Sequence, residues 1–281
     1  MWPDYLVVIW SRMKDPVVRL VRALYGHPRA GFDFFKHLDW VLTQLNWERA
    51  ESFFSLYWKE TEALGAYVDD LEQGGDEANV HRNWDEIHQL LKLSGRGPLY
   101  KFIGTFNVRL NDSAVVVHMK DYAQLLVARF KQDIGVKGPL RRLDVPGVKE
   151  GFQAGDDEPG EYAKIASTHV AGTLYLARAC RPEISFTVGW LGRYVKKWLK
   201  CHDRGLMRMF QYLEHTTDFG LFQYYDPRDK GLLYFSLYCD SDHGGDKTTK
   251  KSTSGWLLFA EGPHGTRVLL DWGSKLQGGV C

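Results

Sequence analysis

The sequence predicts an α+β protein in which helices and antiparallel strands occupy separate regions. Two observations lead to this fold class. Apolar residues recur at helical spacing in four stretches, which are 17–45, 79–93, 120–132 and 161–216. Alternating runs separated by turn residues fill three others, which are 53–68, 100–119 and 219–274. Because strands follow strands, hairpins are favoured over parallel units joined by helices.

The first part of the chain predicts helices on either side of a hairpin. Residues 17–45 are expected to be helical, with a break at Gly26–His27–Pro28. Residues 53–58 and 64–68 are predicted strands, and they suggest a hairpin whose tip carries Asp69 and Asp70. An amphipathic helix is predicted over 79–93, capped by Asn79.

The middle of the chain predicts a second hairpin, a helix and a linker. The alternating runs of 100–119 surround Asn111–Asp112, a pair suited to a hairpin turn. A helix is predicted over 120–132. Residues 135–160 are rich in Gly, Pro and acids and have no apolar period, so they are predicted to be a linker.

The last part predicts three helices and then strands. The helices are 161–180, one that starts at Pro182, and 202–216. The predicted strands are 219–225, 232–242, 252–262 and 267–274, with turns at Asp226–Pro227 and Gly262–Pro263.

Composition limits the classes of function. The 281 residues are 44% hydrophobic and 25% charged, as in ordinary globular proteins, and suffice for two domains. The net charge of +1 means that any site for a polyanion must come from local clustering. Four widely spaced cysteines predict neither a zinc site nor a disulfide framework, and an intracellular location, cytoplasmic or nuclear, is expected. No apolar run is long enough to span a membrane.

The segment YVDD places two carboxylates, Asp69 and Asp70, directly after a predicted strand. Adjacent acids repel each other, and a divalent cation removes that repulsion. Mg²⁺ prefers such hard oxygen ligands. A solvated turn is the alternative, because Asp is a common turn residue. The dipeptide alone does not decide between the two.

A second acidic motif is CDSDHGGD, which precedes a group of lysines. Asp240 and Asp242 are two residues apart and share a face if the strand continues through them. Lys250 and Lys251 follow closely. Acids for a metal beside lysines for phosphates would suit phosphodiester chemistry. A charged turn with solvated lysines is an equally simple interpretation.

A basic stretch between residues 193 and 204 is the third motif. Its cations fall mostly along one side of a predicted helix, and they are Arg193, Lys196, Lys197, Lys200 and Arg204. Aromatic residues lie among them, so contact with nucleic-acid phosphates is one hypothesis. A solvated helix face is the other.

Taken in order, these motifs resemble copia-type LTR retrotransposon polyproteins. The matching stretches are LVRALYG, YVDD, YLARACRPEISFTV, CDSDHGGD, STSGW and DWGSKLQ. The resemblance implies the C-terminal part of a reverse-transcriptase palm onward, followed by the N-terminal part of a ribonuclease H domain. It divides the chain into a partial palm and thumb-like region (1–134), a linker (135–160), a helical connection (161–218) and a truncated ribonuclease-H-like sheet (219–281).

The resemblance also implies site residues, a cofactor and partners. Asp69 and Asp70 match the palm acids, and Asp240 matches the first ribonuclease H acid. Both sites would hold Mg²⁺ and carry out two-metal phosphoryl transfer on an RNA/DNA template–primer. The family's upstream palm Asp and downstream ribonuclease H acids have no counterpart here, so the chain alone is expected to be inactive. The alternative is a non-catalytic remnant that binds nucleic acid, other polyprotein parts or itself.

Overall fold

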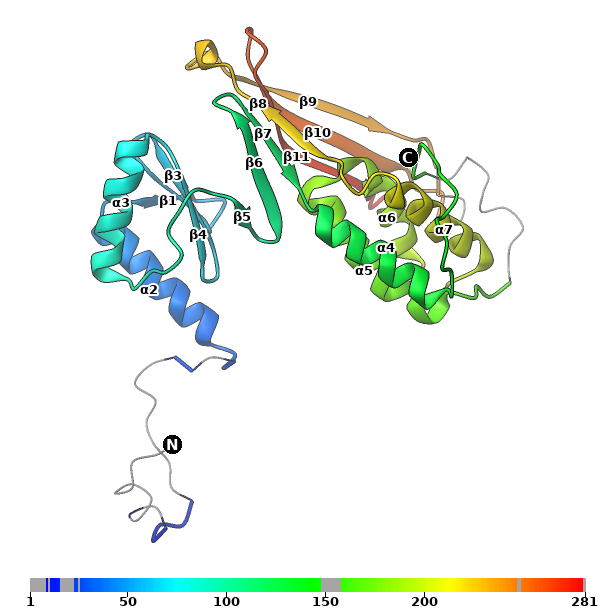
Figure 1. Ribbon diagram of the computed structural model, residues 1–281, viewed down its shortest axis with the longest axis horizontal. Coiled ribbons are helices and arrows are strands. Elements are labelled where there is room, and N and C mark those ends of the chain that lie inside the picture. Colours follow the sequence, from blue (N-terminus) through cyan, green and yellow to red (C-terminus); the bar gives the residue numbers. More distant parts are fainter. Residues whose placement is uncertain are drawn as a thin grey trace. The chain divides into compact units, whose positions relative to one another are not determined.

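The computed structural model describes residues 9, 11–15, 23–24, 26–147, 158–246 and 249–279 (Figure 1). It is an α+β structure with two antiparallel sheets, as predicted. The chain divides into two compact units, Met1–Pro98 and Leu99–Cys281. Most of the helix predicted over 17–25, and the linker residues 148–157, lie outside the described residues. Within the described ranges, no helix is both long enough and apolar enough to cross a membrane.

The first unit contains a four-stranded sheet in the order β1-β2-β3-β4. Its elements are α2 (Ala30–Gln44), β1 (Glu48–Arg49), β2 (Leu56–Lys59), β3 (Glu62–Tyr67), β4 (Asp70–Gly74) and α3 (Glu77–Leu90). Side chains alternate along β3, where Leu64 and Ala66 are buried and Ala63 and Tyr67 are exposed. Leu64 packs in one cluster with residues of both helices. The helices therefore cover one face of this sheet, and the opposite face is open.

Helix α3 begins earlier than predicted. Its N-cap is Asp76, whose side chain accepts a hydrogen bond from the backbone N–H of Ala78 at 3.1 Å. Asp is a preferred N-cap residue because its carboxylate satisfies a free N–H of the first turn. The prediction of Asn79 as the cap is therefore wrong. Asn79 instead donates through Nδ2 to Oε1 of the buried Glu62 at 2.8 Å and ties the helix to β3.

The second unit contains a seven-stranded sheet in the order β5-β6-β7-β8-β11-β10-β9. Its strands are β5 (Lys101–Phe102), β6 (Thr105–Asn111), β7 (Ala114–His118), β8 (Gly220–Tyr224), β9 (Tyr234–Ser241), β10 (Thr253–Glu261) and β11 (Arg267–Leu276). Its helices are α4 (Lys120–Asp133), α5 (Ala163–Cys180), α6 (Ser185–Arg193) and α7 (Lys200–Glu214), with short 3₁₀ turns η1 (Pro182–Ile184) and η2 (Pro227–Asp229).

Pairing between β7 and β8 joins segments that are about a hundred residues apart in the sequence. Val116 lies opposite Phe222, and the ladder continues in both directions. Helix α4 packs against α7 on the same unit, where the rings of Phe130 and Phe210 stack with centroids 4.0 Å apart. Residues 99–134 therefore belong with the C-terminal part of the chain. The observed division after Pro98 differs from the predicted boundary at 134 for this reason.

The structure describes residues 135–147 and 158–160 of the predicted linker, and residues 135–147 contain no helix or strand but are anchored along α7. The backbone N–H of the buried Leu140 donates to Oε2 of Glu214 at 2.5 Å. Arg208 donates through Nε to the carbonyl of Gly147 at 3.1 Å. This stretch is thus part of the packed unit.

The helix predicted to start at Pro182 ends earlier than its apolar pattern indicates. Pro182 opens the 3₁₀ turn η1, and α6 follows and ends at Arg193. The next helix begins at Lys200, so residues 194–199 form a turn between two helices. The basic stretch therefore does not lie on one helix face as predicted.

Candidate functional site

The YVDD segment forms the tight turn between β3 and β4. Tyr67 pairs with Asp70 across the hairpin, so Val68 and Asp69 form a two-residue loop. Such loops need a positive φ at their first central residue, which is usually Gly, Asn or Asp. Here that residue is Val68, with φ of +54°. A β-branched residue in this conformation is a genuine outlier and costs on the order of 1–3 kcal/mol.

Both carboxylates of this turn are exposed to solvent. Neither Asp69 nor Asp70 has a side-chain hydrogen bond or ion pair with any described residue, so their oxygens remain available to a cation. Asp70 shares the open face of the sheet with Tyr67. The hairpin therefore presents two hard oxygen donors from consecutive residues.

Glu72 is a third acid on the same strand that sequence reasoning missed. It lies two residues after Asp70 and so faces the same side of the sheet. Its carboxylate rests against Gly65, where an added Cβ would lie 3.0 Å from Oε1. Burial raises the pKa of Glu72. The spacing of the acids could have identified it, because i and i+2 in a strand share a face.

The acids of this turn are ligands of the type that Mg²⁺ prefers, but they are too few to complete its coordination. Oxygen donors are what Mg²⁺ prefers, with several positions left for water and phosphate. In the described parts of both units, no three His, Cys, Asp or Glu side chains come together as a possible metal-binding set. The turn can thus contribute ligands to a metal site without completing one.

The second unit has a groove of about 510 Å³ between the β9–β11 sheet and the start of α6. Its lining includes Asp240, Asp242, Glu183, Phe186 and Trp256. The groove thus combines carboxylates with aromatic side chains.

Asp240 and Asp242 both line the groove, but in different backbone settings. β9 ends at Ser241, so Asp240 lies on the strand and Asp242 begins the following loop. The Oδ1 atom of Asp240 accepts the N–H of Ser241 at 2.8 Å. The Oδ1 atom of Asp242 accepts the N–H of Thr253 at 2.7 Å and therefore closes the loop.

Asp246 anchors this loop to α6. Its buried carboxylate accepts hydrogen bonds from Tyr194 Oη at 3.3 Å and from the N–H of Thr249 at 2.9 Å. Arg193 Nη1 lies 3.5 Å from the same carboxylate, and Nη2 donates to Thr253 Oγ1 at 3.2 Å. Arg193, a predicted nucleic-acid contact, is thus engaged within the protein.

The other predicted basic contacts have different settings. Lys196 and Lys197 are exposed in the turn between α6 and α7, and Lys250 is exposed after the loop. Lys200 pairs with Glu158. Lys251 donates through Nζ to the carbonyl of Gly278 at 2.6 Å. The predicted lysines are therefore distributed over a turn, a helix start and a loop.

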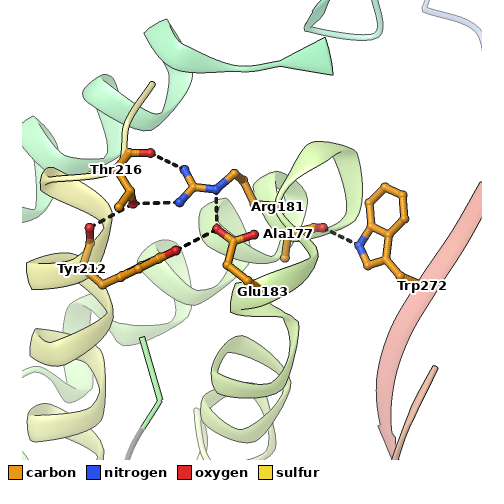
Figure 2. Close-up of polar contacts among 6 residues, drawn as sticks. All are labelled: Ala177, Arg181, Glu183, Tyr212, Thr216 and Trp272. Atoms are coloured by element: carbon orange, nitrogen blue, oxygen red, sulfur yellow. Dashed lines mark hydrogen bonds and ion pairs between the residues drawn. The ribbon is translucent and has the colours of Figure 1, made fainter. Parts of the chain in front are cut away.

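Arg181 forms a buried network that the sequence did not reveal (Figure 2). It is 1% exposed, and its Nη atoms donate to the carbonyl and to Oγ1 of Thr216, each at 2.7 Å. Its Nε donates to Glu183 Oε1 at 2.5 Å, and Tyr212 Oη donates to the same oxygen at 3.3 Å. Glu183, a wall residue of the groove, is thereby fixed in place. The R-P-E order around Pro182 was the available signal.

Trp272 fixes the sheet to the helices beside this network. Its Nε1 donates to the carbonyl of Ala177 in α5 at 2.9 Å (Figure 2). Trp272 itself lines the groove. The strand that lines this side of the groove is therefore held to α5 by a direct hydrogen bond.

Comparison with known proteins identifies transposon proteins as relatives. No protein-family model and no solved structure matches this chain. It is 26% identical over 271 residues to the retrovirus-related Pol polyprotein from transposon RE1 of Arabidopsis thaliana, covering 94% of this chain and 17% of that protein. It is 25% identical to a transposon Ty5-1 protein of Saccharomyces cerevisiae, covering 96% of this chain and 85% of that protein.

A third relative matches a similar share of this chain at a similar identity. The retrovirus-related Pol polyprotein from transposon TNT 1-94 of Nicotiana tabacum is 27% identical, with 94% of this chain and 20% of that protein covered. The chain thus spans a fifth or less of the two plant polyproteins and most of the yeast protein. These relatives align with nearly the whole chain, through both structural units. Along nearly its whole length the chain is therefore similar to copia-type retrotransposon Pol polyproteins.

Proposed function

We propose that this chain is a reverse transcriptase and ribonuclease H segment of a retrotransposon polyprotein. The observation that carries the proposal is the strained β3–β4 turn, where Val68 at φ +54° is followed by two exposed carboxylates, Asp69 and Asp70, which have no side-chain partner among the described residues. Strain of this kind is retained where the surrounding structure or the function requires it. A turn that served only to reverse the chain would be more stable with Gly or Asn in place of Val68.

In this proposal the two units supply acids to two separate metal sites. Asp69 and Asp70 would hold Mg²⁺ at the palm-like hairpin, and Asp240 would hold it in the groove of the second unit. The bound ions would stabilise negative charge on the transferring phosphoryl group. The Oδ2 atom of Asp240 would be the metal ligand, because its Oδ1 atom accepts a hydrogen bond from the N–H of Ser241.

The protein's own cations would position the nucleic acid. Lys196, Lys197 and Lys250 are exposed and suit contacts with phosphates, which are sequence-independent and weaken with salt. Arg193 would act differently, by holding the loop that carries Asp242 against α6. Its loss would change the shape of the groove, whereas loss of a lysine would remove an electrostatic contact.

Catalytic turnover is not expected from this chain alone. The described residues contain no set of three metal-binding side chains, and two carboxylates leave a small cation with little fixed geometry. Primer extension on an RNA template with purified protein should therefore give no product above an Asp69→Asn control. Extension that disappears in Asp69→Asn would show that the site is complete.

Binding of a template–primer hybrid tests the proposed function itself. Fluorescence anisotropy with a labelled RNA/DNA hybrid should show binding that weakens as salt rises and strengthens with Mg²⁺. The Mg²⁺ effect should be lost in Asp69→Asn, Asp70→Asn, while Asp76→Asn keeps a good N-cap and serves as a matched control. No binding at low salt would refute a nucleic-acid function.

A non-catalytic nucleic-acid-binding role is the second candidate, and the incomplete donor set favours it. It predicts equal binding in Mg²⁺ and in EDTA, since the carboxylates then have no role. It also predicts weaker binding when Lys196, Lys197 and Lys250 are replaced together by Ala. The comparison of binding with and without the metal separates the two candidates.

A further inference from the structure

His202 is a buried histidine at the start of α7 that the proposed function does not use. It is 2% exposed and is the third residue after the N-cap, Leu199. Its Nδ1 atom accepts a hydrogen bond from the backbone N–H of Leu199 at 2.9 Å. Glu or Gln usually accepts this bond at the third position of a helix, so the imidazole takes the place of a capping side chain. Because Nδ1 is an acceptor, the ring carries its single proton on Nε2 and is neutral.

Three aromatic rings surround this imidazole. Tyr194 stacks on it, with ring centroids 4.4 Å apart and 22° between the planes. Trp190 and Trp198 lie at tilted angles, with centroids 5.2 and 5.3 Å from it. Trp190 belongs to α6, whereas Tyr194 and Trp198 belong to the turn between α6 and α7. His202 therefore packs the start of α7 against both the turn and the preceding helix.

Tyr194 connects the imidazole to the loop beside the groove. Its Oη atom donates to Oδ2 of the buried Asp246 at 3.3 Å. The Oδ1 atom of Asp246 accepts the N–H of Thr249 at 2.9 Å. We call the described loop residues, 242–246 and 249–252, the acid loop. One carboxylate thus holds the acid loop to itself and to the aromatic ring that rests on the histidine.

One carboxylate on α7 acts on the imidazole. Burial lowers the pKa of His202, and the charge of Asp203 opposes that change without reversing it. Both oxygens of Asp203 already accept hydrogen bonds. Oδ2 accepts the N–H of Glu161 at 2.7 Å, and Oδ1 accepts the N–H of Tyr162 at 3.0 Å and Trp198 Nε1 at 2.6 Å. Asp203 therefore has a fixed position and a defined role at the start of α5.

Further charged groups flank His202 on neighbouring segments. Arg193, at the end of α6, lies 3.5 Å from Asp246 at the hydroxyl end of Tyr194. Lys200, in the first turn of α7, pairs with Glu158. The N–H groups at the start of a helix carry a partial positive charge, which disfavours a second proton on a ring placed there. Burial and the helix start therefore both oppose the imidazolium.

We propose that neutral His202 holds the acid loop in place through Tyr194 and Asp246, and that protonation of the imidazole releases it. A proton on Nδ1 would face the N–H of Leu199, so two donors would meet at 2.9 Å without an acceptor. The ring would then leave its site, and Tyr194 would lose the surface on which it stacks. Because the acid loop carries Asp242, its release would move a carboxylate that lines the groove.

The release is expected at acid pH. Histidine has an ordinary pKa of about 6.5 in an unfolded chain. Because the pKa of His202 is lowered in the folded protein, the neutral ring contributes its full stabilisation above about pH 6.5 and loses it as the pH falls below that value. Neither metal binding nor nucleic-acid binding takes part in this transition, so its test is independent of the proposed function.

Nuclear magnetic resonance of the ¹⁵N-labelled chain, titrated from about pH 7.5 to about pH 4, tests the proposal. The ring signals of His202 and the N–H signals of Leu199 and Thr249 should shift with one shared midpoint below the ordinary histidine value. Protection of the Leu199 N–H from hydrogen exchange, corrected for the intrinsic effect of pH, should fall by at least about tenfold. Helix content by circular dichroism should stay constant at that midpoint.

Three substitutions separate the steps of the transition. His202→Gln keeps an acceptor for the N–H of Leu199 but cannot gain a proton, so the shared transition should disappear. Tyr194→Phe keeps the stacked ring and removes the hydroxyl donor, so the signal of Leu199 should still titrate while that of Thr249 should not. His243→Gln removes the exposed histidine of the acid loop itself and should leave the shared transition unchanged.

Three results would overturn the proposal. The first is a Thr249 signal that keeps its wild-type midpoint in His202→Gln, and the second is a His202 ring that stays neutral over the whole titration. The third is a loss of helix content at the shared midpoint, because the whole unit would then unfold and not the acid loop alone. If His202→Gln does not fold, Tyr194→Phe decides, since it leaves the histidine in place.

Discussion

The guanidinium of Arg181 is buried in the second unit and donates three hydrogen bonds within it. Two go to Thr216, one goes to Glu183, and Tyr212 shares that last acceptor. Its ring neighbours are Tyr212 and Phe219, whose centroids lie 5.8 and 5.5 Å from the guanidinium carbon. Removing one member of such a network leaves buried polar groups without partners.

We expect Arg181→Ala to lower the free energy of unfolding of the second unit by about 3 kcal/mol, the usual cost of breaking a buried pair. Arg181→Lys should recover part of the loss, because an ammonium cannot make the forked contacts to Thr216. Chemical denaturation, monitored by Trp fluorescence, measures the free energy of unfolding of each variant. Arg141→Ala, which removes an exposed arginine of the same unit, should change the value by less than about 1 kcal/mol. Similar losses in Arg181→Ala and Arg141→Ala would contradict the assigned role.

The lowered pKa of Asp226 predicts that the free energy of unfolding depends on pH in the acid range. Hydrogen bonds from the side chain and the backbone N–H of Arg228 lower its pKa to about 2. A carboxyl group with a lowered folded-state pKa stabilises the fold above its unfolded pKa of about 4. That contribution is lost as the pH falls from about 4 towards 2.

The melting temperature of Asp226→Asn should therefore lie below the wild-type value at neutral pH. The difference should stay constant down to about pH 4 and shrink below it, as the wild-type carboxylate protonates. Asp112→Asn, at a fully exposed turn, is the matched control and should show no such pattern. A difference that grows as the pH falls would mean that Asp226 has another role.

At the scale of elements, the crossing of α6 and α7 depends on a glycine. A Cβ on Gly205 would lie 2.6 Å from Trp190 Cζ3, closer than real Cβ contacts. Gly205→Ala should therefore destabilise the second unit by about 1–3 kcal/mol, as overpacking does in tight cores.

Gly192 gives the matched comparison for this prediction. It lies in α6, is exposed, and an added Cβ would meet nothing closer than 3.9 Å. Gly192→Ala should be neutral or stabilising by up to about 1 kcal/mol, because Ala favours helix. Equal effects of the two substitutions on thermal unfolding would rule out the contact with Trp190 as the cause.

Local elements could be predicted from the sequence because their signals are local. The turns at Asp226–Pro227 and Gly262–Pro263, the hairpin around Asn111–Asp112 and the helix over 120–132 are all confirmed. The cap of α3 was misplaced because Asp76 and Asn79 are both good cap residues, and only the structure decides between them. Pairing of β7 with β8 was missed because it joins distant segments and depends on tertiary packing.

The candidate site was predictable in part. The sequence predicted Asp69 and Asp70 at the tip of a hairpin formed by 53–58 and 64–68. The two acids do lie at a hairpin turn, but that turn joins β3 to β4, a strand that was not predicted, whereas β2 and β3 are joined by a separate turn at Glu60–Thr61. Metal binding by Asp69 and Asp70 stays a prediction.

Arg193 was assigned to nucleic acid because its engagement with Asp246 crosses more than fifty residues of sequence. The buried network of Arg181 could not be predicted from the sequence, because its partner Thr216 follows α7 and lies 35 residues further along the chain.

At the scale of the whole molecule, the two units have separate cores and separate candidate sites. The first unit carries the acidic turn on an open sheet, and the second carries the groove beside η1 and α6. The chain aligns along nearly its whole length with transposon polyproteins, so both units are similar to parts of the same relatives. The proposed chemistry therefore requires that each unit bind a cation independently.

Nuclear magnetic resonance of the ¹⁵N-labelled chain during titration with Mn²⁺, a paramagnetic substitute for Mg²⁺, tests that requirement most directly. The account predicts that signals of residues 67–72 broaden first and that those of residues 239–242 follow. Asp69→Asn, Asp70→Asn should abolish the first set and leave the second unchanged. Broadening that spares the β3–β4 turn, or that is unaffected by this double substitution, would contradict the assignment of the paired acids to a metal.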